Sequence, residues 1–378
     1  MPNQFVENIS VKIVADQNMP LVQELFSPYG EVQLLPGRDI CAADIVDAQV
    51  LLVRSVTKVN RQLLEGSSVK FVGSATIGTD HIDQEYLASV GIAFAHAPGC
   101  NAESVVQYDL SVMCRLMPDW RQKTVGIVGC GNVGGRLYQR LRDLDVRCRV
   151  YDPFLSLLDM PDMGTFDSIL GCDIICLHTP MTTDGEYPTK HLFDRQALAQ
   201  LRPDSLLINA GRGAVIDNNA LLEGFKNGFS GQVALDVWEA EPRVDTELLA
   251  YVALATPHIA GYSQEGKRNG SEMVYRAFMA YLGEQVANES GSFIEAYVAL
   301  EAHNLNEAIL GSYDVALDDR RMRDEINAAQ ASGDMEAVAQ AFDRLRRDYQ
   351  VRRECSFYAV SNQLKALRDY RSLGFAVI

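Results

Sequence analysis

The sequence lacks the features that direct a protein into or across a membrane. No apolar stretch approaches the roughly 18 residues of a membrane-spanning helix. The first residues, M-P-N-Q-F-V-E-N-I-S, contain no basic segment followed by an apolar run, so they do not resemble a signal peptide. We therefore expect a cytoplasmic protein that has no membrane partner.

The sequence also lacks the cysteine patterns of disulfide scaffolds and zinc sites. None of the eight cysteines belongs to a C-x-x-C pair, and Cys172 and Cys176 have no histidine or cysteine partners at zinc-binding spacing. We expect free thiols in a reducing compartment and no metal centre.

Basic residues are scarce. The sequence has 34 Lys and Arg against 50 Asp and Glu, which gives a formal net charge of −16. Such a chain repels nucleic acid and anionic lipid, so neither is an expected partner. An anionic small molecule would have to bind at a local cluster of basic residues.

The patterns that are present predict an α/β fold. In the first hundred residues, short apolar runs at Val11–Ala15, Gln49–Val53 and Val69–Val72 alternate with helical patterns at Gln17–Phe26 and Asn60–Leu64. A second region of the same kind starts near residue 123. This alternation is typical of parallel βαβ units, so we predict two doubly wound, Rossmann-like parallel-sheet domains.

The pattern changes past about residue 290. Helices are expected at Asp324–Gln330, Met335–Gln350 and Asn362–Leu373, with strands at Ser356–Val360 and Phe375–Ile378. These elements predict a small additional α/β domain. Its two arginine-rich runs, R-L-R-R and V-R-R, are interpreted as the solvated side of an amphipathic helix, with an anion-binding site as the alternative.

A glycine-rich turn, G-C-G-N-V-G, lies between a predicted strand and a predicted helix, which is the context of a dinucleotide-binding turn. Gly129 permits the tight turn, Gly131 lets the backbone approach a pyrophosphate, and Gly134 lets helix and strand pack closely. The amides around Asn132 and Val133 are expected to face the phosphates.

Asp152 ends the next predicted strand, 18 residues after Gly134. A carboxylate at that position accepts hydrogen bonds from a ribose diol and repels a 2′-phosphate. Pro153 and Phe154 follow it, and no arginine is there to bind such a phosphate. The sequence therefore predicts NAD rather than NADP.

Three polar residues follow the turn in fixed order: Arg212 in N-A-G-R-G, Glu241 in D-V-W-E-A-E-P and His258 in T-P-H-I-A-G. Singly, each has an ordinary explanation as a surface arginine, a turn glutamate or a loop histidine. Each, however, follows a predicted strand, and open α/β sheets bind ligands at the carboxyl ends of their strands. Together they suit a 2-hydroxy acid, since a guanidinium clamps its carboxylate, an imidazole moves its hydroxyl proton, and a carboxylate orients the imidazole.

Five motifs occur in the order of one known family: G-I-V-G-C-G-N-V-G, H-T-P, I-N-A-G-R-G, D-V-W-E-A-E-P and T-P-H-I-A-G. Over roughly residues 10–290 the chain resembles the D-isomer-specific 2-hydroxyacid dehydrogenases. The resemblance implies NAD-dependent oxidation of a 2-hydroxy acid, with Arg212, Glu241 and His258 as the catalytic set. It further implies cofactor contacts at Thr179, Ala210, Asp236 and Gly261.

The resemblance also implies a domain organisation. Residues 1–97 and 266–289 would form a discontinuous substrate-binding domain, and residues 98–265 would form the NAD-binding domain. The tail, residues 290–378, resembles the extra C-terminal dimerisation domain of one member of the family. We therefore expect a homodimer.

Further segments resemble that same member, which acts on a phosphorylated 2-hydroxy acid: L-V-R-S-V-T-K-V-N, F-V-G-S-A-T-I-G-T-D-H, A-P-G-C-N-A and H-I-A-G-Y-S-Q-E-G-K. The resemblance implies that Ser55, Thr76 and Tyr262 contact the substrate. On chemical grounds we add Arg54, because a phosphate needs positive charge in an acidic protein. The alternative for Arg54 is an ordinary surface charge after a strand.

Two other functions stay open. The protein could oxidise a different phosphorylated acid, as a 3-phosphoglycerate dehydrogenase does, although the tail fits the dimerisation module better. It could instead be an NAD-sensing interaction protein, like the transcriptional corepressors that share this fold. The acidic charge and the lack of low-complexity segments count against that second function.

Overall fold

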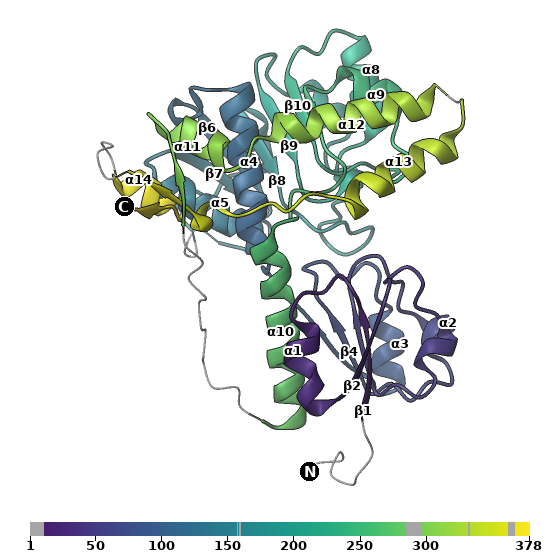
Figure 1. Ribbon diagram of the computed structural model, residues 1–378. Coiled ribbons are helices and arrows are strands. Elements are labelled where there is room, and N and C mark those ends of the chain that lie inside the picture. The colour runs from purple at the N-terminus through teal and green to yellow at the C-terminus, as the bar shows by residue number, and fades with distance from the viewer. Residues whose placement is uncertain (1–10, 157, 159, 285–296, 332, 362–366) are drawn as a thin grey trace. The chain divides into compact units, whose positions relative to one another are not determined.

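The computed structural model describes residues 11–156, 158, 160–284, 297–331, 333–361 and 367–378 (Figure 1). The chain divides into two compact units. Among the described residues, the first unit contains 11–101 and 263–284, and the second contains 102–262 and the part after 296. The three-domain division made from the sequence stays a prediction.

The first unit is a five-stranded parallel sheet with the strand order β2-β1-β3-β4-β5. Its strands are β1 (Val11–Asp16), β2 (Gly30–Leu35), β3 (Val50–Val53), β4 (Phe71–Ser74) and β5 (Ala93–His96). Its helices are α1 (Val22–Phe26), α2 (Arg61–Leu64), α3 (Gln84–Ser89) and α10 (Gln264–Leu282), with 3-10 turns η1 (Ser27–Tyr29) and η2 (Ala42–Ile45).

Helices cover both faces of this sheet. Helices α1 and α10 lie on one face, where Phe26 and Phe278 share a buried cluster with Leu52 (Figure 1). Helices α2 and α3 pack on the other face. Helix α10 comes from much later in the sequence, and Gly73 of β4 allows its close approach, because a Cβ there would lie 2.4 Å from a methyl carbon of Val274.

One helix of this unit begins later than predicted, and strands β2 and β5 and helix α3 were not predicted. The helix expected at Gln17–Phe26 begins only at Val22, because the Asp16 carboxylate accepts the Asn18 backbone N–H at 2.8 Å and holds the chain in a turn. Strand β2 was not predicted. It is an edge strand with partly exposed residues, so its sequence lacks the apolar run of a buried strand.

The second unit contains a six-stranded parallel sheet with the order β11-β10-β9-β8-β6-β7. Its strands are β6 (Thr124–Val128), β7 (Arg147–Tyr151), β8 (Ile174–Leu177), β9 (Leu206–Asn209), β10 (Gln232–Leu235) and β11 (Leu254–Ala255). Helix α4 (Ala102–Leu116) and the 3-10 turn η3 (Trp120–Gln122) precede the first of these strands. The helices and 3-10 turn between the strands are α5 (Asn132–Asp143), α6 (Phe166–Leu170), α7 (Arg195–Ala199), η4 (Gly213–Val215), α8 (Asn218–Lys226) and α9 (Thr246–Tyr251). The predicted doubly wound α/β class is confirmed.

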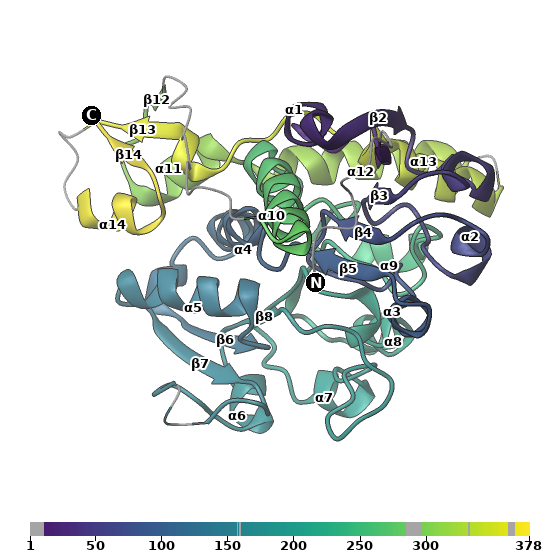
Figure 2. The ribbon, with the colours of Figure 1, turned by 90° about the horizontal axis from the view of Figure 1, so that it is seen from below.

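The C-terminal segment adds a three-stranded parallel sheet in the order β12-β13-β14, flanked by α11 and α14 (Figure 2). Its elements are β12 (Val298–Leu300), α11 (Leu305–Ser312), α12 (Val315–Gln330), α13 (Met335–Arg347), η5 (Cys355–Phe357), β13 (Tyr358–Val360), α14 (Leu367–Ser372) and β14 (Ala376–Val377). The start of the predicted Asn362–Leu373 helix lies outside the described residues.

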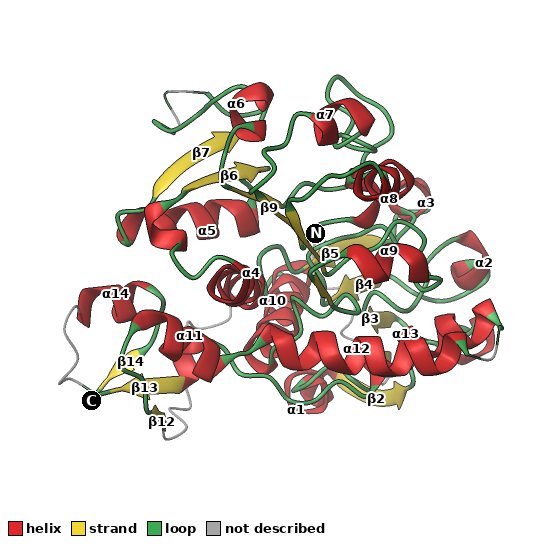
Figure 3. Cartoon of the chain, turned by 90° about the horizontal axis from the view of Figure 1, so that it is seen from above, coloured by secondary structure: helices red, strands yellow, loops and turns green. Residues whose placement is uncertain are grey.

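Helix α12 packs against β11, α4 and α9 of the large-sheet region, and α13 packs against α12 (Figure 3). Met322 and Phe342 belong to the same buried cluster as Leu248 and Leu207 of the large-sheet region. The C-terminal segment therefore shares its core with the dinucleotide-binding fold. Among the described residues, no helix has both the length and the apolar character that crossing a membrane requires.

Candidate active site

The glycine-rich turn lies between β6 and α5, as predicted. Gly129 has a φ of 83°, in the left-handed region that favours glycine. A Cβ on Gly134 would lie 1.9 Å from the Gly129 carbonyl oxygen, so glycine is needed for α5 to approach β6 this closely. A Cβ added to Gly131 would meet no neighbouring atom within 4 Å. Open space therefore adjoins the first turn of α5, Asn132 and Val133, where a helix N-terminus attracts phosphate.

Asp152 follows β7 and lies beside this turn. Its Oδ2 accepts a hydrogen bond from the Cys130 backbone N–H at 2.9 Å, and its Oδ1 accepts one from the Phe154 backbone N–H at 3.1 Å. These bonds hold a partly exposed carboxylate next to the turn. The position fits a ribose diol and disfavours a 2′-phosphate, which agrees with NAD.

A buried histidine–aspartate pair, which the sequence analysis missed, lies at the end of β8. His178 Nε2 is 3.0 Å from Asp109 Oδ2 on α4. Burial raises the pKa of Asp109, although His178 partly offsets the shift. The next residue, Thr179, packs against Gly129, and its buried hydroxyl has no hydrogen-bond partner among the described residues. An unsatisfied hydroxyl beside the turn fits a residue that contacts a bound cofactor.

Arg212 follows a tight turn after β9. The side-chain amide of buried Asn209 donates to the Arg212 carbonyl oxygen at 3.0 Å and so shapes the turn. A Cβ on Gly213 would lie 2.1 Å from the Trp238 carbonyl oxygen. The backbone just after Arg212 therefore packs directly against the segment that carries Glu241.

Glu241 and His258 form a close pair. His258 Nδ1 lies 2.5 Å from Glu241 Oε1, and Glu241 Oε2 accepts the Trp238 backbone N–H at 3.2 Å. Burial alone raises the pKa of Glu241, but His258 and Arg346 outweigh it and hold that pKa below its usual range. An ionised carboxylate on Nδ1 leaves Nε2 of the imidazole to exchange a proton with a substrate hydroxyl.

Buried Asp236 holds the loop that carries His258. Its Oδ1 accepts the Thr256 hydroxyl at 2.7 Å and the Ile259 N–H at 2.8 Å, and its Oδ2 accepts the Ala260 N–H at 2.9 Å. Its carbonyl oxygen accepts the His258 N–H at 2.7 Å. Asp236 therefore positions the imidazole, and its predicted cofactor contact stays a prediction.

The other residues predicted to contact the cofactor lie after two strands of the same sheet, β9 and β11. Ala210 directly follows β9, and Gly261 follows His258 in the loop after β11. Both are partly buried. Their contacts with NAD stay predictions.

Arg346 and Arg352 belong to the two arginine-rich runs of the C-terminal segment, R-L-R-R and V-R-R. The sequence analysis interpreted these runs as solvated, and that interpretation is wrong for these two side chains. Buried Arg352 donates to the Ser104 and Ala260 carbonyl oxygens, and its guanidinium lies 3.9 Å from the centre of the Tyr313 ring. Arg346 donates to the Tyr262 hydroxyl at 3.3 Å. The hydrogen-bond partners named here are 84 to 248 residues away along the chain, so no local pattern marks them.

The predicted substrate residues of the first unit follow β3 and β4. Arg54 Nε lies 3.0 Å from the buried Asp16 carboxylate, which offsets its charge. Ser55 is exposed, and the Thr76 hydroxyl donates to a backbone carbonyl at 2.7 Å. Lys267 of α10, which the sequence analysis did not single out, has a lowered pKa because of burial and the nearby Arg54.

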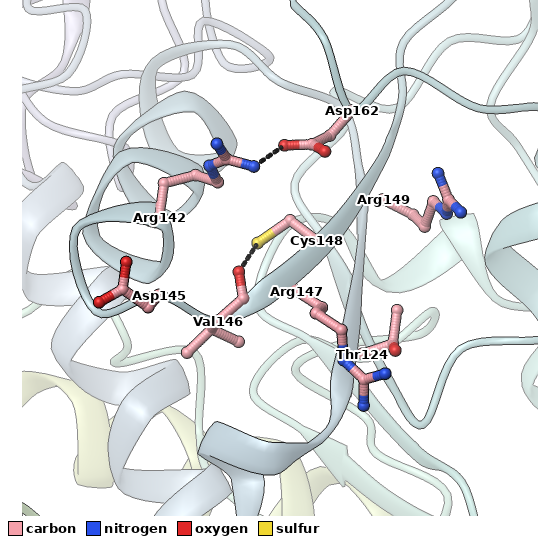
Figure 4. Close-up of a pocket in the computed structure, with 8 residues that line it drawn as sticks. All are labelled: Thr124, Arg142, Asp145, Val146, Arg147, Cys148, Arg149 and Asp162. Atoms are coloured by element: carbon pink, nitrogen blue, oxygen red, sulfur yellow. Dashed lines mark hydrogen bonds and ion pairs between the residues drawn. The ribbon is translucent and has the colours of Figure 1, made fainter.

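A surface pocket of about 450 Å³ lies elsewhere, along edge strand β7 (Figure 4). It includes Thr124 and Arg147, which begin β6 and β7, and Arg149. Arg142 in this pocket is paired with Asp162 at 2.7 Å. The pocket adjoins the amino ends of these strands, whereas the glycine turn and Asp152 are at their carboxyl ends, so we do not assign it to the active site.

Comparison with family models identifies the central region. Residues 105–260 match the model described as D-isomer specific 2-hydroxyacid dehydrogenase, NAD binding domain. Residues 293–374 match a model described as a domain of unknown function, DUF3410.

Comparison with curated proteins covers nearly the whole chain. The sequence is 47% identical to the erythronate-4-phosphate dehydrogenases of Teredinibacter turnerae and Cellvibrio japonicus, over 97% of this chain and 99% and 100% of theirs. The chain belongs to the erythronate-4-phosphate dehydrogenase family. The predictions of an NAD-dependent oxidoreductase and of the 2-hydroxyacid dehydrogenase family are thereby confirmed.

Solved structures share the fold. The D-lactate dehydrogenase of Aquifex aeolicus matches with a TM-score of 0.61 and 20% identity, over 72% of this chain and 95% of that one. The 3-phosphoglycerate dehydrogenase of Entamoeba histolytica matches with a TM-score of 0.63 and 22% identity, over 75% and 98%. These structures support the α/β class and do not choose a substrate.

Proposed function

We propose that the protein oxidises 4-phospho-D-erythronate at C2 to 2-oxo-3-hydroxy-4-phosphobutanoate with NAD, a step in pyridoxine (vitamin B6) biosynthesis. The observation that carries this proposal is the 47% identity to erythronate-4-phosphate dehydrogenases across 97% of the chain. The narrower sequence segments agree with this substrate, and the paired His258 and Glu241 support oxidation of a hydroxy acid.

The chain's own residues divide the chemistry among them. Arg212 binds the substrate carboxylate and polarises the C2 oxygen. His258 takes the C2 hydroxyl proton on Nε2, while Glu241 holds Nδ1 and stabilises the imidazolium that forms. When bound, NAD supplies the hydride acceptor. Ser55, Thr76 and Tyr262 bind the rest of the substrate, and Arg54 directly precedes Ser55 in the sequence.

Purified protein should be given NAD with 4-phosphoerythronate, 3-phosphoglycerate or unphosphorylated glycerate, while NADH formation is followed. We expect the highest kcat/KM with 4-phosphoerythronate. Turnover of 3-phosphoglycerate alone would contradict the substrate assignment. Binding of NAD without turnover of any hydroxy acid would favour the NAD-sensing interaction protein instead.

We also propose that the protein is a cytoplasmic homodimer that assembles through the C-terminal segment. Its support is the sequence resemblance of that segment to a dimerisation domain. Light scattering on the full chain should give twice the mass of 41.8 kDa. A monomeric mass across the concentrations used in the activity assay would contradict the dimer.

A further inference from the structure

Three arginines lie within four residues of one another at the end of α13, and one of them differs from the other two. Arg344 and Arg347 are exposed and pair with Glu325 at 3.5 Å and Asp348 at 2.9 Å. Arg346 points inward instead, and its guanidinium carbon lies 6.0 Å from the centre of the Tyr262 ring. Tyr262 belongs to the loop that also carries His258.

Arg346 is incompletely paired. It donates one hydrogen bond, to the Tyr262 hydroxyl at 3.3 Å. Its Nε is shielded from solvent and has no hydrogen-bond partner within the described part of the chain, and the carboxylates of Glu241 and Asp343 act on it through electrostatic attraction. Leaving a buried charged donor unsatisfied is costly, so the side chain has unused capacity for an anion.

The position of Arg346 is close enough to the Glu241–His258 pair to affect it. After burial and His258, Arg346 is the next influence on the pKa of Glu241, which it lowers. Glu241 acts on Arg346 in turn. Burial lowers the pKa of Arg346, but Tyr262 and Glu241 outweigh burial, so this pKa lies above its usual range. Arg346 therefore lies within electrostatic reach of the groups that move the substrate proton, and it contacts a residue predicted to bind substrate.

We propose that Arg346 binds the terminal phosphate of the substrate together with Tyr262, so that the C-terminal segment of a chain completes the substrate site beside its own catalytic residues. This inference rests on the proposed function. A guanidinium fork matches phosphate oxygens and stays charged when it is buried. We assign the phosphate rather than the substrate carboxylate to Arg346, because the carboxylate is assigned to Arg212. Arg54, the other candidate named from the sequence, is already neutralised by Asp16.

The test compares Arg346→Gln with the wild type on 4-phosphoerythronate and on unphosphorylated erythronate. We expect kcat/KM for the phosphorylated acid to fall by about 30-fold or more, since a buried charged contact is lost. With erythronate, kcat/KM should change by less than about 3-fold, because no phosphate contact is there to lose. Arg344→Gln is the matched control on the same helix and should leave both values unchanged. Thermal unfolding of each variant shows that the fold is kept.

A second readout does not depend on turnover. Inorganic phosphate binding to the NAD-loaded full-length protein, measured by calorimetry, should weaken by a similar factor in Arg346→Gln and not in Arg344→Gln. An equal loss on both substrates, or unchanged phosphate binding, would overturn the proposal. If the wild type fails to oxidise 4-phosphoerythronate, the proposed function is wrong, and the calorimetric comparison still decides whether Arg346 binds phosphate.

Discussion

The second unit contains two histidine–glutamate pairs of nearly equal length, and their glutamates are two residues apart. His258 Nδ1 lies 2.5 Å from Glu241, and His191 Nε2 lies 2.6 Å from Glu239. Their side chains are also similarly exposed. Neither hydrogen-bond length nor exposure distinguishes the pair that we assign to catalysis.

The surroundings of the two pairs do distinguish them. His258 follows strand β11 at the carboxyl end of the sheet, in the loop that Asp236 holds. The other oxygen of Glu239 accepts the Asn218 backbone N–H at 3.1 Å, at the start of α8. His191 also lies 3.8 Å from the carboxylate of Asp217. The second pair therefore ties two loops together, and position at a strand end identifies the reactive pair better than its geometry does.

Removing the imidazoles one at a time gives the largest contrast. His258→Ala should lower kcat by about 1,000-fold, because the group that takes the hydroxyl proton is lost. NAD affinity, measured by fluorescence titration, should stay close to that of the wild type. His191→Ala is the matched control and should keep kcat within about 2-fold. Comparable kcat losses in the two variants would show that the pairs are not functionally different.

Replacing the glutamates tests how the imidazole is held. Glu241→Gln should lower kcat by about 100-fold, since an amide neither orients His258 equally well nor stabilises the imidazolium. Glu239→Gln should lower it by less than about 2-fold. Steady-state kinetics on both variants decides the matter, and a larger effect of Glu239→Gln would move the catalytic role to the other pair.

Replacing Asp152 should change NAD affinity more than it changes kcat. Asp152→Ala should weaken NAD binding by about 10-fold through loss of charged hydrogen bonds to the ribose, with a smaller effect on kcat at saturating NAD. Its preference for NAD over NADP should also fall. If NAD affinity stays at the wild-type level, Asp152 serves only to hold the Cys130 and Phe154 amides.

The sequence predicts best the features that depend on neighbouring residues. The glycine turn, the strands around it and the order of Arg212, Glu241 and His258 are local patterns, because each polar residue lies three to six residues after the end of its strand. The start of α12 was missed because its first turns carry Asp318 and Asp319, which look solvated but are buried. Asp319 accepts the Ala255 backbone N–H at 2.8 Å, a bond that no local pattern reveals.

The roles of Arg346, Arg352 and Asp109 were missed for the same physical reason. Each depends on a partner far away in the sequence, and a charged side chain reads as solvated until that partner is known. Arg54 shows the converse, because the positive charge predicted to bind the substrate phosphate is paired with Asp16. Long-range pairing of charges is thus the part of this site that required the structure.

The smallest effect expected concerns stability against acid. In the folded protein the pKa of Glu241 lies below its ordinary value of 4.5, so the ionised carboxylate contributes stability above that value. The contribution is lost as the pH falls through the lower folded pKa. Glu241→Gln should therefore lower the free energy of unfolding at neutral pH by less than about 1 kcal/mol, and the difference from the wild type should shrink below about pH 4. Denaturant unfolding at several pH values measures this difference, with Glu239→Gln as the matched control. A difference that persists unchanged in acid would mean that lost packing, rather than the charged pair with His258, accounts for the effect.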